Sequence, residues 1–245
     1  MDGRVVADAR REIDALFRHG AMQPGGFTIA GRDDLVTAKR DDHTLWLNEY
    51  LNLVGGPKKG GAETVLALDG CLAKFGAAVA TAVSELDKPQ EPFGRGKNGR
   101  PLHYTGRTDL MCACYPGGGA AYGPHVDNAD GDGREAEDFG RCYTLVYYLN
   151  DAAWDAEVSG GALRLHFAPP AVASDGRWPR SAPVGSTPHE FTDIPPCGDT
   201  LIMFRADKVL HEVRPAKAKR YAMTVWLYGG SSEHAAALRA RGQIM

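Results

Sequence analysis

Hydrophobic positions in the N-terminal part of the chain follow the period of an α-helix. Apolar residues recur every three or four positions over residues 6–17 and end before a glycine, which predicts an amphipathic helix. Residues 63–86 are rich in alanine and leucine and predict a longer helix, with a bend at Gly70 or Gly76. Helices therefore dominate the prediction for residues 1–105.

The pattern changes in the second half of the chain to short apolar segments separated by Gly, Pro, Asp and Asn clusters. Segments rich in β-branched and aromatic residues predict strands, and they read DLMCACY, CYTLVYYLN, GALRLHF, DTLIMF and RYAMTVWLYG. Residues 168–196 hold seven of the fifteen prolines, which are too many for a central strand. This stretch therefore predicts a long loop between two strands. Helices followed by strands predict one α+β domain over 1–245, with helices supporting an antiparallel sandwich or jelly roll over 106–230.

The composition excludes several classes of partner. A net charge of −3, without a basic run interleaved with aromatic residues, argues against a nucleic-acid partner. The N-terminal segment carries charges throughout, and no apolar stretch approaches the ~18 residues of a membrane span, so we expect neither a signal peptide nor a membrane partner. The five cysteines form no C-x-x-C motif and favour reduced thiols. We expect a cytoplasmic monomer, with the nucleus as an alternative location.

The stretch YGPHVDNADGDG places a histidine and an aspartate two residues apart. In an extended segment His125 and Asp127 project to the same side, so an imidazole nitrogen and a carboxylate oxygen can reach one metal ion. A solvated polar pair is the simple alternative. A calcium-binding loop is a poorer one, because its twelfth position would be Phe139 where a bidentate glutamate is needed.

A second histidine and an arginine occur later in the chain, in LHEVRPAKAKRYAMTVWLYG. His211 follows an apolar strand, and Arg220 opens the next strand nine residues on. Two histidines and a carboxylate form the facial triad of non-haem Fe(II) oxygenases, which leaves positions open for a chelating co-substrate and oxygen. A guanidinium close by can hold the far carboxylate of 2-oxoglutarate in a bidentate manner.

The same strings resemble the hypoxia-inducible-factor prolyl hydroxylases. The matching segments are GRTDLMCACYPGGGAAYGPHVDN, GRCYTLVYYLN, WDAEVSGGALRL and HEVRPAKAKRYAMTVW, with RDDHTLWL as a weaker match. The resemblance implies a double-stranded β-helix, or jelly roll, with N-terminal supporting helices and a short C-terminal helix. It also implies Fe(II), 2-oxoglutarate and O2 as cofactor and co-substrates, ascorbate as a supporting reductant, and hydroxylation at C4 of a proline in a protein substrate, with oxygen sensing as a possible role.

The resemblance also implies a role for each of a set of residues. His125, Asp127 and His211 bind iron, and Arg220 pairs with the distal carboxylate of 2-oxoglutarate. The remaining co-substrate residues are Tyr148, Tyr115, Thr224 and Met111, and those facing the peptide proline are Tyr122, Arg141 and Trp226. Alternate residues of a strand face the core whatever the function, so Met111 could equally be a core residue.

Several alternatives stay open on the sequence alone. Collagen-type prolyl hydroxylases share the layout but place a lysine ten residues after the distal histidine, where this chain has Tyr221. A hydroxylase of a free amino acid or another small molecule, and a binding module without turnover, are the other two. The substrate protein is not identified: the resemblance allows a hypoxia-inducible-factor-like chain, protist Skp1 or bacterial elongation factor Tu.

Three segments have no firm assignment in this interpretation. The insertions at residues 134–140 and from residue 168 onward could border the substrate, although solvated loops are the simpler interpretation. Residues 40–47 could form a mobile strand-and-loop lid over a peptide.

Overall fold

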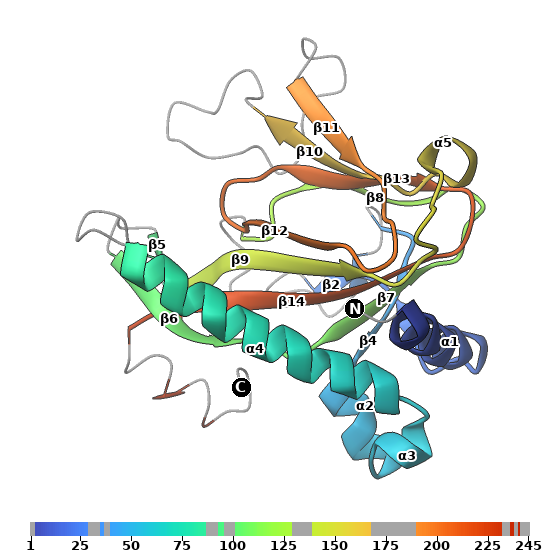
Figure 1. Ribbon diagram of the computed structural model, residues 1–245, viewed down its shortest axis with the longest axis horizontal. Coiled ribbons are helices and arrows are strands. Elements are labelled where there is room, and N and C mark those ends of the chain that lie inside the picture. The colour runs from blue at the N-terminus through green and yellow to red at the C-terminus, as the bar shows by residue number, and fades with distance from the viewer. Residues whose placement is uncertain are drawn as a thin grey trace.

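The protein consists of two facing antiparallel sheets, with helices on the outer side of the larger one (Figure 1). The computed structural model describes residues 3–28, 35–36, 40–86, 93–95, 101–128, 139–167, 190–231, 236–237 and 240. The predicted α+β jelly roll with N-terminal supporting helices is confirmed. Most of the predicted C-terminal helix and most of the insertion at 134–140 lie outside the described residues.

The larger sheet is built around the longest strand, β14. One side of β14 pairs with β9, which in turn pairs with β12, and the other side pairs with β7 and β6. Strand β4 continues the sheet beyond β7, followed by β1, and β5 lies beyond β6. The strands are β1 (Gln23–Pro24), β4 (His43–Trp46), β5 (Gly94–Arg95), β6 (Pro101–Arg107), β7 (Met111–Tyr115), β9 (Phe139–Tyr148), β12 (Leu201–Arg205) and β14 (Arg220–Gly230).

The smaller sheet has the order β11-β10-β13-β8 and covers the inner face of the larger one (Figure 1). Its strands are β8 (Ala120–His125), β10 (Leu163–Phe167), β11 (Glu190–Ile194) and β13 (His211–Ala216). A separate two-stranded sheet pairs β2 (Phe27–Thr28) with β3 (Leu35–Val36). The helices are α1 (Gly3–Arg18), α2 (Leu47–Val54), α3 (Pro57–Gly60), α4 (Glu63–Leu86) and α5 (Ala156–Ser159).

Alternation along the strands of the larger sheet separates two hydrophobic cores. On β7, Cys112 and Cys114 belong to the core beneath the helices, whereas Met111, Ala113 and Tyr115 belong to the core between the sheets. Because successive side chains of a strand point to opposite faces, each strand contributes to both cores. The polar residues of the site project from the face between the sheets.

The long helix α4 runs unbroken across the larger sheet (Figure 1). No bend interrupts it. A side chain at Gly76 would contact Leu227 of β14 at 3.0 Å, so the glycine permits close packing on the sheet. Glu12 of α1 accepts hydrogen bonds from the Thr64 and Val65 backbone amides, which satisfies free donors in the first turn of α4.

Contrary to the expectation from the sequence, Glu63–Val83 is long and apolar enough, by length and composition alone, to cross a membrane. In the structure this segment lies along the larger sheet, with Leu68 and Leu72 buried. It also carries Asp69, which pairs with Arg107 of β6. We therefore interpret α4 as the helix that supports the sheet.

The structure adds detail to two expectations about irregular segments. The proline-rich stretch 168–196 contains β11, an edge strand paired with β10. Proline restricts central strands more than edge strands, which explains why a strand fits there. The strand of the strand-and-loop lid proposed for residues 40–47 is β4, which pairs with β7 over four residues inside the larger sheet, while the mobility of the segment stays a prediction.

The buried ion pair between α4 and β6 leads to a stability prediction. Arg107 donates two hydrogen bonds to Asp69, at 2.7 and 2.8 Å, and both side chains are nearly inaccessible. Replacing Asp69 by asparagine leaves a buried guanidinium without its counter-charge, so we expect the free energy of unfolding to fall by about 3–5 kcal/mol. Urea-induced unfolding measures this change.

A matched control is the pair of Arg164 with Asp193, which has the same two-bond geometry at 2.7 Å but is solvent-accessible. Asp193→Asn should cost less than about 1 kcal/mol, because exposed pairs are screened by water. Equal losses in the two variants would contradict a special role for the buried pair.

Candidate metal centre and its surroundings

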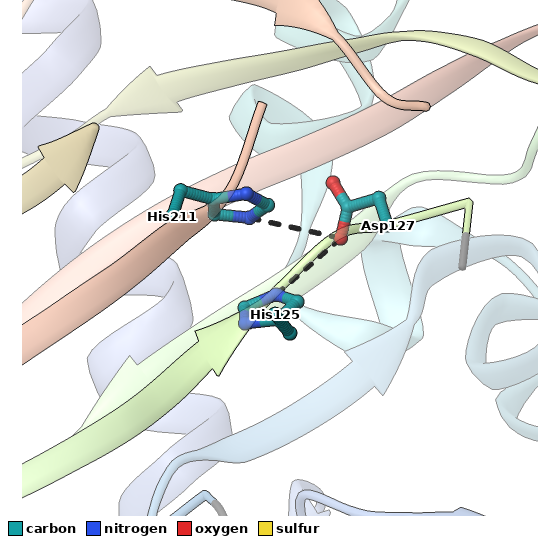
Figure 2. A group of neighbouring side chains, drawn as sticks. All are labelled: His125, Asp127 and His211. Atoms are coloured by element: carbon teal, nitrogen blue, oxygen red, sulfur yellow. Dashed lines mark ion pairs between the residues drawn. The ribbon is translucent and has the colours of Figure 1, made fainter. Parts of the chain in front are cut away.

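Strand pairing in the smaller sheet brings the two histidines together. His125 is the last residue of β8 and His211 the first of β13, and the two are directly paired. Asp127 lies in the turn that follows β8, and its Oδ1 is 3.4 Å from His125 Nε2 and 3.7 Å from His211 Nε2 (Figure 2). Among the described residues, this is the one group of three or more His, Cys, Asp or Glu side chains with metal-binding geometry.

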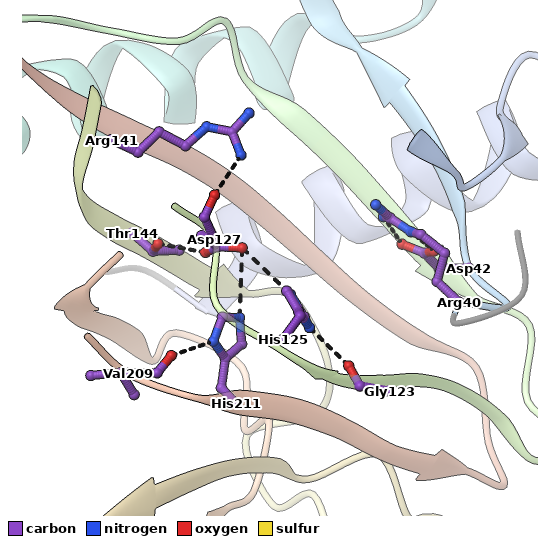
Figure 3. Close-up of polar contacts among 9 residues, drawn as sticks. All are labelled: Arg40, Asp42, Gly123, His125, Asp127, Arg141, Thr144, Val209 and His211. Carbon is purple, nitrogen blue, oxygen red and sulfur yellow. Dashed lines mark hydrogen bonds and ion pairs between the residues drawn. The ribbon is translucent and has the colours of Figure 1, made fainter. Parts of the chain in front are cut away.

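The two imidazole rings are oriented by backbone carbonyls. His125 Nδ1 is 2.9 Å from the Gly123 carbonyl oxygen, and His211 Nδ1 is 3.0 Å from that of Val209 (Figure 3). A carbonyl can only accept, so each Nδ1 carries the proton and each Nε2 presents a lone pair. Both lone pairs are therefore available to a metal, and second-sphere bonds of this kind fix the orientation of histidine ligands.

The ionisation of the cluster also suits a cation. Burial opposes the charged form of Asp127, but the interactions with His211 and His125 and the hydrogen bond from Thr144 outweigh it and hold the carboxyl pKa well below its usual range. Burial, together with the nearby His125, lowers the pKa of His211 to about 4. An ionised carboxylate and a neutral imidazole are the forms that bind metal ions.

The spacing of the donors fits one divalent ion. Bond lengths of about 2.0–2.2 Å to nitrogen and oxygen place neighbouring ligand atoms roughly 3 Å apart. The observed separations of 3.4 and 3.7 Å need only small side-chain movements to reach this value. Two imidazoles and one carboxylate form the donor set of the facial triad, which suits Fe(II).

Arg220 lies on the inner face of the larger sheet and is 2% exposed. Its Nε donates to the Gly161 carbonyl oxygen at 2.8 Å. The guanidinium carbon is 4.9 Å from the centre of the Tyr115 ring and 5.0 Å from that of Tyr148. Two aromatic rings and one carbonyl therefore hold the guanidinium in a single place.

The hydroxyl of Tyr148 is buried and has no hydrogen-bond partner among the described residues. Burial raises the pKa of this hydroxyl, so it remains a donor at neutral pH. A buried donor without a partner costs free energy unless a ligand satisfies it. With Arg220 adjacent, a carboxylate is the group that would satisfy both.

The other residues predicted for the co-substrate lie on the same face. Thr224 of β14 pairs with Met111 of β7 and with Val146 of β9, so Thr224 and Met111 are neighbours. Met111 packs in the core between the sheets, together with Tyr115 and Tyr148. The structure thus brings these residues together, while their contact with a co-substrate stays a prediction.

Of the three residues predicted to face a peptide, Tyr122 and Arg141 contact the histidine–aspartate cluster, and Trp226 contacts Arg141. The Tyr122 ring stacks on His125, with centroids 3.8 Å apart. The Arg141 guanidinium lies 4.5 Å from the Trp226 ring centre, and its Nη1 donates to the Asp127 carbonyl oxygen at 3.2 Å. Trp226 Nε1 is buried without a partner in the described part of the chain.

Sequence reasoning missed several residues of this region. Thr144 donates to Asp127, Trp46 lies 6.0 Å from Trp226 between ring centres, and Arg40 pairs with Asp42 (Figure 3) and stacks on Tyr122. Thr144 could have been found, because it shares the inward register of Tyr148 in CYTLVYYLN. The other residues depend on the placement of β4, which the local pattern did not predict.

Tyr221 occupies the position at which collagen-type enzymes are expected to carry a lysine. Tyr221 pairs with Cys114 and belongs to the core beneath the helices. Its hydroxyl donates to Asp14 of α1 at 2.5 Å. The tenth residue after His211 therefore points away from the cluster, and in this chain only the ninth, Arg220, projects into the face between the sheets.

Comparisons with known proteins agree with this geometry. Residues 110–228 match the 2OG-Fe(II) oxygenase superfamily. Human Egl nine homolog 1 is 45% identical over 99% of this chain, which spans 43% of that protein. Mouse prolyl hydroxylase EGLN3 is 41% identical, with 92% of this chain and 74% of the mouse protein covered. A Trichoplax adhaerens prolyl hydroxylase, solved with a hypoxia inducible factor oxygen degradation domain peptide, is 28% identical, with a TM-score of 0.60 over 96% of this chain and 81% of that one.

Proposed function

Because the chain belongs to the hypoxia-inducible-factor prolyl hydroxylase family of 2OG-Fe(II) oxygenases, we propose that it hydroxylates C4 of a proline in a protein substrate. The reaction uses Fe(II), 2-oxoglutarate and O2, and its rate reports oxygen availability. Ascorbate supports turnover by keeping the iron reduced. The five free cysteines favour a reducing compartment, the cytoplasm or the nucleus.

One observation carries the proposal: the histidine–aspartate cluster, on the smaller sheet, and the Arg220–Tyr148 pair, on the larger sheet, both lie between the two sheets. The cluster offers three donors to Fe(II) and leaves other coordination positions for small ligands. Arg220 supplies a fixed positive charge, and the Tyr148 hydroxyl is a buried donor that lacks a partner. A 2-oxo dicarboxylate has a chelating 2-oxo acid end for a metal ion held by the cluster, and a distal carboxylate for Arg220 and Tyr148.

The residues of the chain bind and orient the reactants. The Arg220 guanidinium, held by Gly161, presents its remaining N–H groups to the distal carboxylate. Tyr148 donates its hydroxyl to the same group, and the rings of Tyr115 and Tyr148 exclude water from the contact. Tyr122, Arg141 and Trp226 line the side on which the prolyl ring approaches.

Iron, when bound, supplies the activation of O2 that is coupled to decarboxylation of 2-oxoglutarate to succinate and carbon dioxide. The protein contributes metal ligands in a fixed geometry, a guanidinium that pairs with the co-substrate carboxylate, and a largely buried histidine–aspartate cluster. Low exposure of Asp127 and His211 limits access of water to the reacting centre.

The proposal is tested with the purified chain, Fe(II), 2-oxoglutarate and a synthetic peptide from the oxygen degradation domain of hypoxia inducible factor. We expect mass spectrometry to find one added oxygen atom on the target proline, with an equal amount of succinate. The control peptide carries alanine in place of that proline and should show neither. The rate should rise with O2 concentration.

Other outcomes would redirect the assignment. Hydroxylation of free proline without hydroxylation of any peptide or of lysate proteins would favour the small-molecule alternative. Binding of metal and 2-oxoglutarate without any turnover would favour a binding module. Absence of metal binding would remove the proposal altogether.

A further inference from the structure

The position of Asp127 is set by contacts outside strand β8. The strand ends at His125, so strand geometry alone does not direct the carboxylate. The Asn128 backbone amide donates to the Ala206 carbonyl oxygen at 2.9 Å, and the Asn128 side chain donates to that of Arg141 at 2.8 Å. Arg141 in turn donates to the Asp127 carbonyl oxygen. These bonds fix the backbone of the turn to strand β9 and to the end of β12.

None of these backbone contacts fixes the rotation of the carboxylate. That is determined by Thr144 of β9, which is 1% exposed and donates its hydroxyl to Asp127 Oδ2 at 2.6 Å (Figure 3). The other oxygen, Oδ1, faces the Nε2 atoms of His125 and His211. The two oxygens of one carboxylate therefore have different partners.

We propose that Thr144 is a positioning residue that restricts Asp127 to a single metal-facing oxygen. The inference rests on the metal centre of the proposed function. A free carboxylate can bind a cation through one or both oxygens, and a charge-assisted hydrogen bond to Oδ2 favours the first mode. One carboxylate oxygen and two imidazoles occupy three coordination positions of the metal ion. The position that a second carboxylate oxygen would take therefore remains open to a chelating co-substrate.

The test compares three variants by titration with Mn²⁺, followed calorimetrically without 2-oxoglutarate. Thr144→Val keeps the shape of the side chain and removes the hydroxyl. Its Mn²⁺ dissociation constant should rise by about 10–100-fold, as is typical when a second-sphere partner of a metal ligand is lost. Thr144→Ser restores a hydroxyl donor and should bind close to the unmodified protein.

Thr105→Val is the matched control. Thr105 is also a buried threonine, in β6 of the same sheet, but its hydroxyl donates to the Tyr228 carbonyl oxygen. Loss of that bond should lower the unfolding temperature without changing Mn²⁺ affinity. Weaker Mn²⁺ binding in both valine variants would indicate a general structural defect. Weaker Mn²⁺ binding in Thr144→Val alone would indicate a defect in the metal centre.

The outcomes separate this inference from the proposed function. If the unmodified chain binds no Mn²⁺, the metal centre itself is wrong. If it binds Mn²⁺ and folded Thr144→Val binds equally well, the positioning role is wrong. If Thr144→Val does not fold, the crystal structure of the Mn²⁺-loaded unmodified protein decides: two-oxygen coordination by Asp127 overturns the inference, and one-oxygen coordination with Thr144 bonded to the other oxygen supports it.

Discussion

Replacing Arg220 by alanine is expected to raise the dissociation constant for 2-oxoglutarate by about 10²–10⁴-fold, because two charge-assisted hydrogen bonds are lost. Metal affinity should change little, since Arg220 contacts Gly161, Tyr115 and Tyr148 rather than the cluster. Calorimetric titration of the Mn²⁺-loaded protein with 2-oxoglutarate measures the first quantity, and titration with Mn²⁺ alone measures the second.

Two further variants sharpen this result. Arg220→Lys should recover only part of the affinity, because an ammonium group cannot form the planar two-bond contact. Lys219→Ala is the control, since its amine pairs with Asp14 of α1 on the other side of the sheet. An Arg220→Ala protein that binds 2-oxoglutarate normally, or a Lys219→Ala protein that loses it, would contradict the assignment.

Replacing Asp127 by asparagine is expected to reduce hydroxylation to background. The change preserves shape but removes the one anionic donor of the cluster. Loss of a second-sphere partner costs about 10–100-fold in metal affinity, so loss of a direct ligand should cost more than that. Mn²⁺ should then no longer raise the thermal unfolding temperature, because stabilisation by a ligand requires binding to the folded state.

Asp193→Asn provides the comparison for this experiment. Asp193 lies on β11 and pairs with Arg164. This variant should keep both the Mn²⁺-dependent rise in unfolding temperature and the hydroxylation activity. Metal-dependent stabilisation that survives in Asp127→Asn would show that the ion binds elsewhere and would remove Asp127 from the ligand set.

Local periodicity predicted the elements that depend on local contacts. The helix expected over residues 63–86 is α4, and the five apolar segments of the second half correspond to β7, β9, β10, β12 and β14. The alternation of β7 also assigns Met111 and Tyr115 to one face and Cys112 to the other. These features follow from the two side-chain periods of 3.6 and 2, which each segment carries within itself.

Local patterns could not predict contacts between distant segments. The short strand β4 enters the larger sheet because it pairs with β7, more than sixty residues later, and β11 forms in a proline-rich stretch because β10 offers an edge. The buried pair of Asp69 with Arg107 likewise joins a helix to a strand 38 residues away. Such contacts depend on packing that no window of neighbouring residues contains.

The candidate site illustrates the same division. The sequence by itself determined which residues could supply the chemistry: a histidine and a carboxylate two residues apart, a distal histidine, and an arginine nine residues later. Only the tertiary structure decided that His125 pairs directly with His211, and that Thr144 and the bonds of Asn128 direct Asp127 toward them. The physical reason is that residue type determines which atoms can bind, whereas their convergence depends on strand register and on hydrogen bonds between segments far apart in the chain.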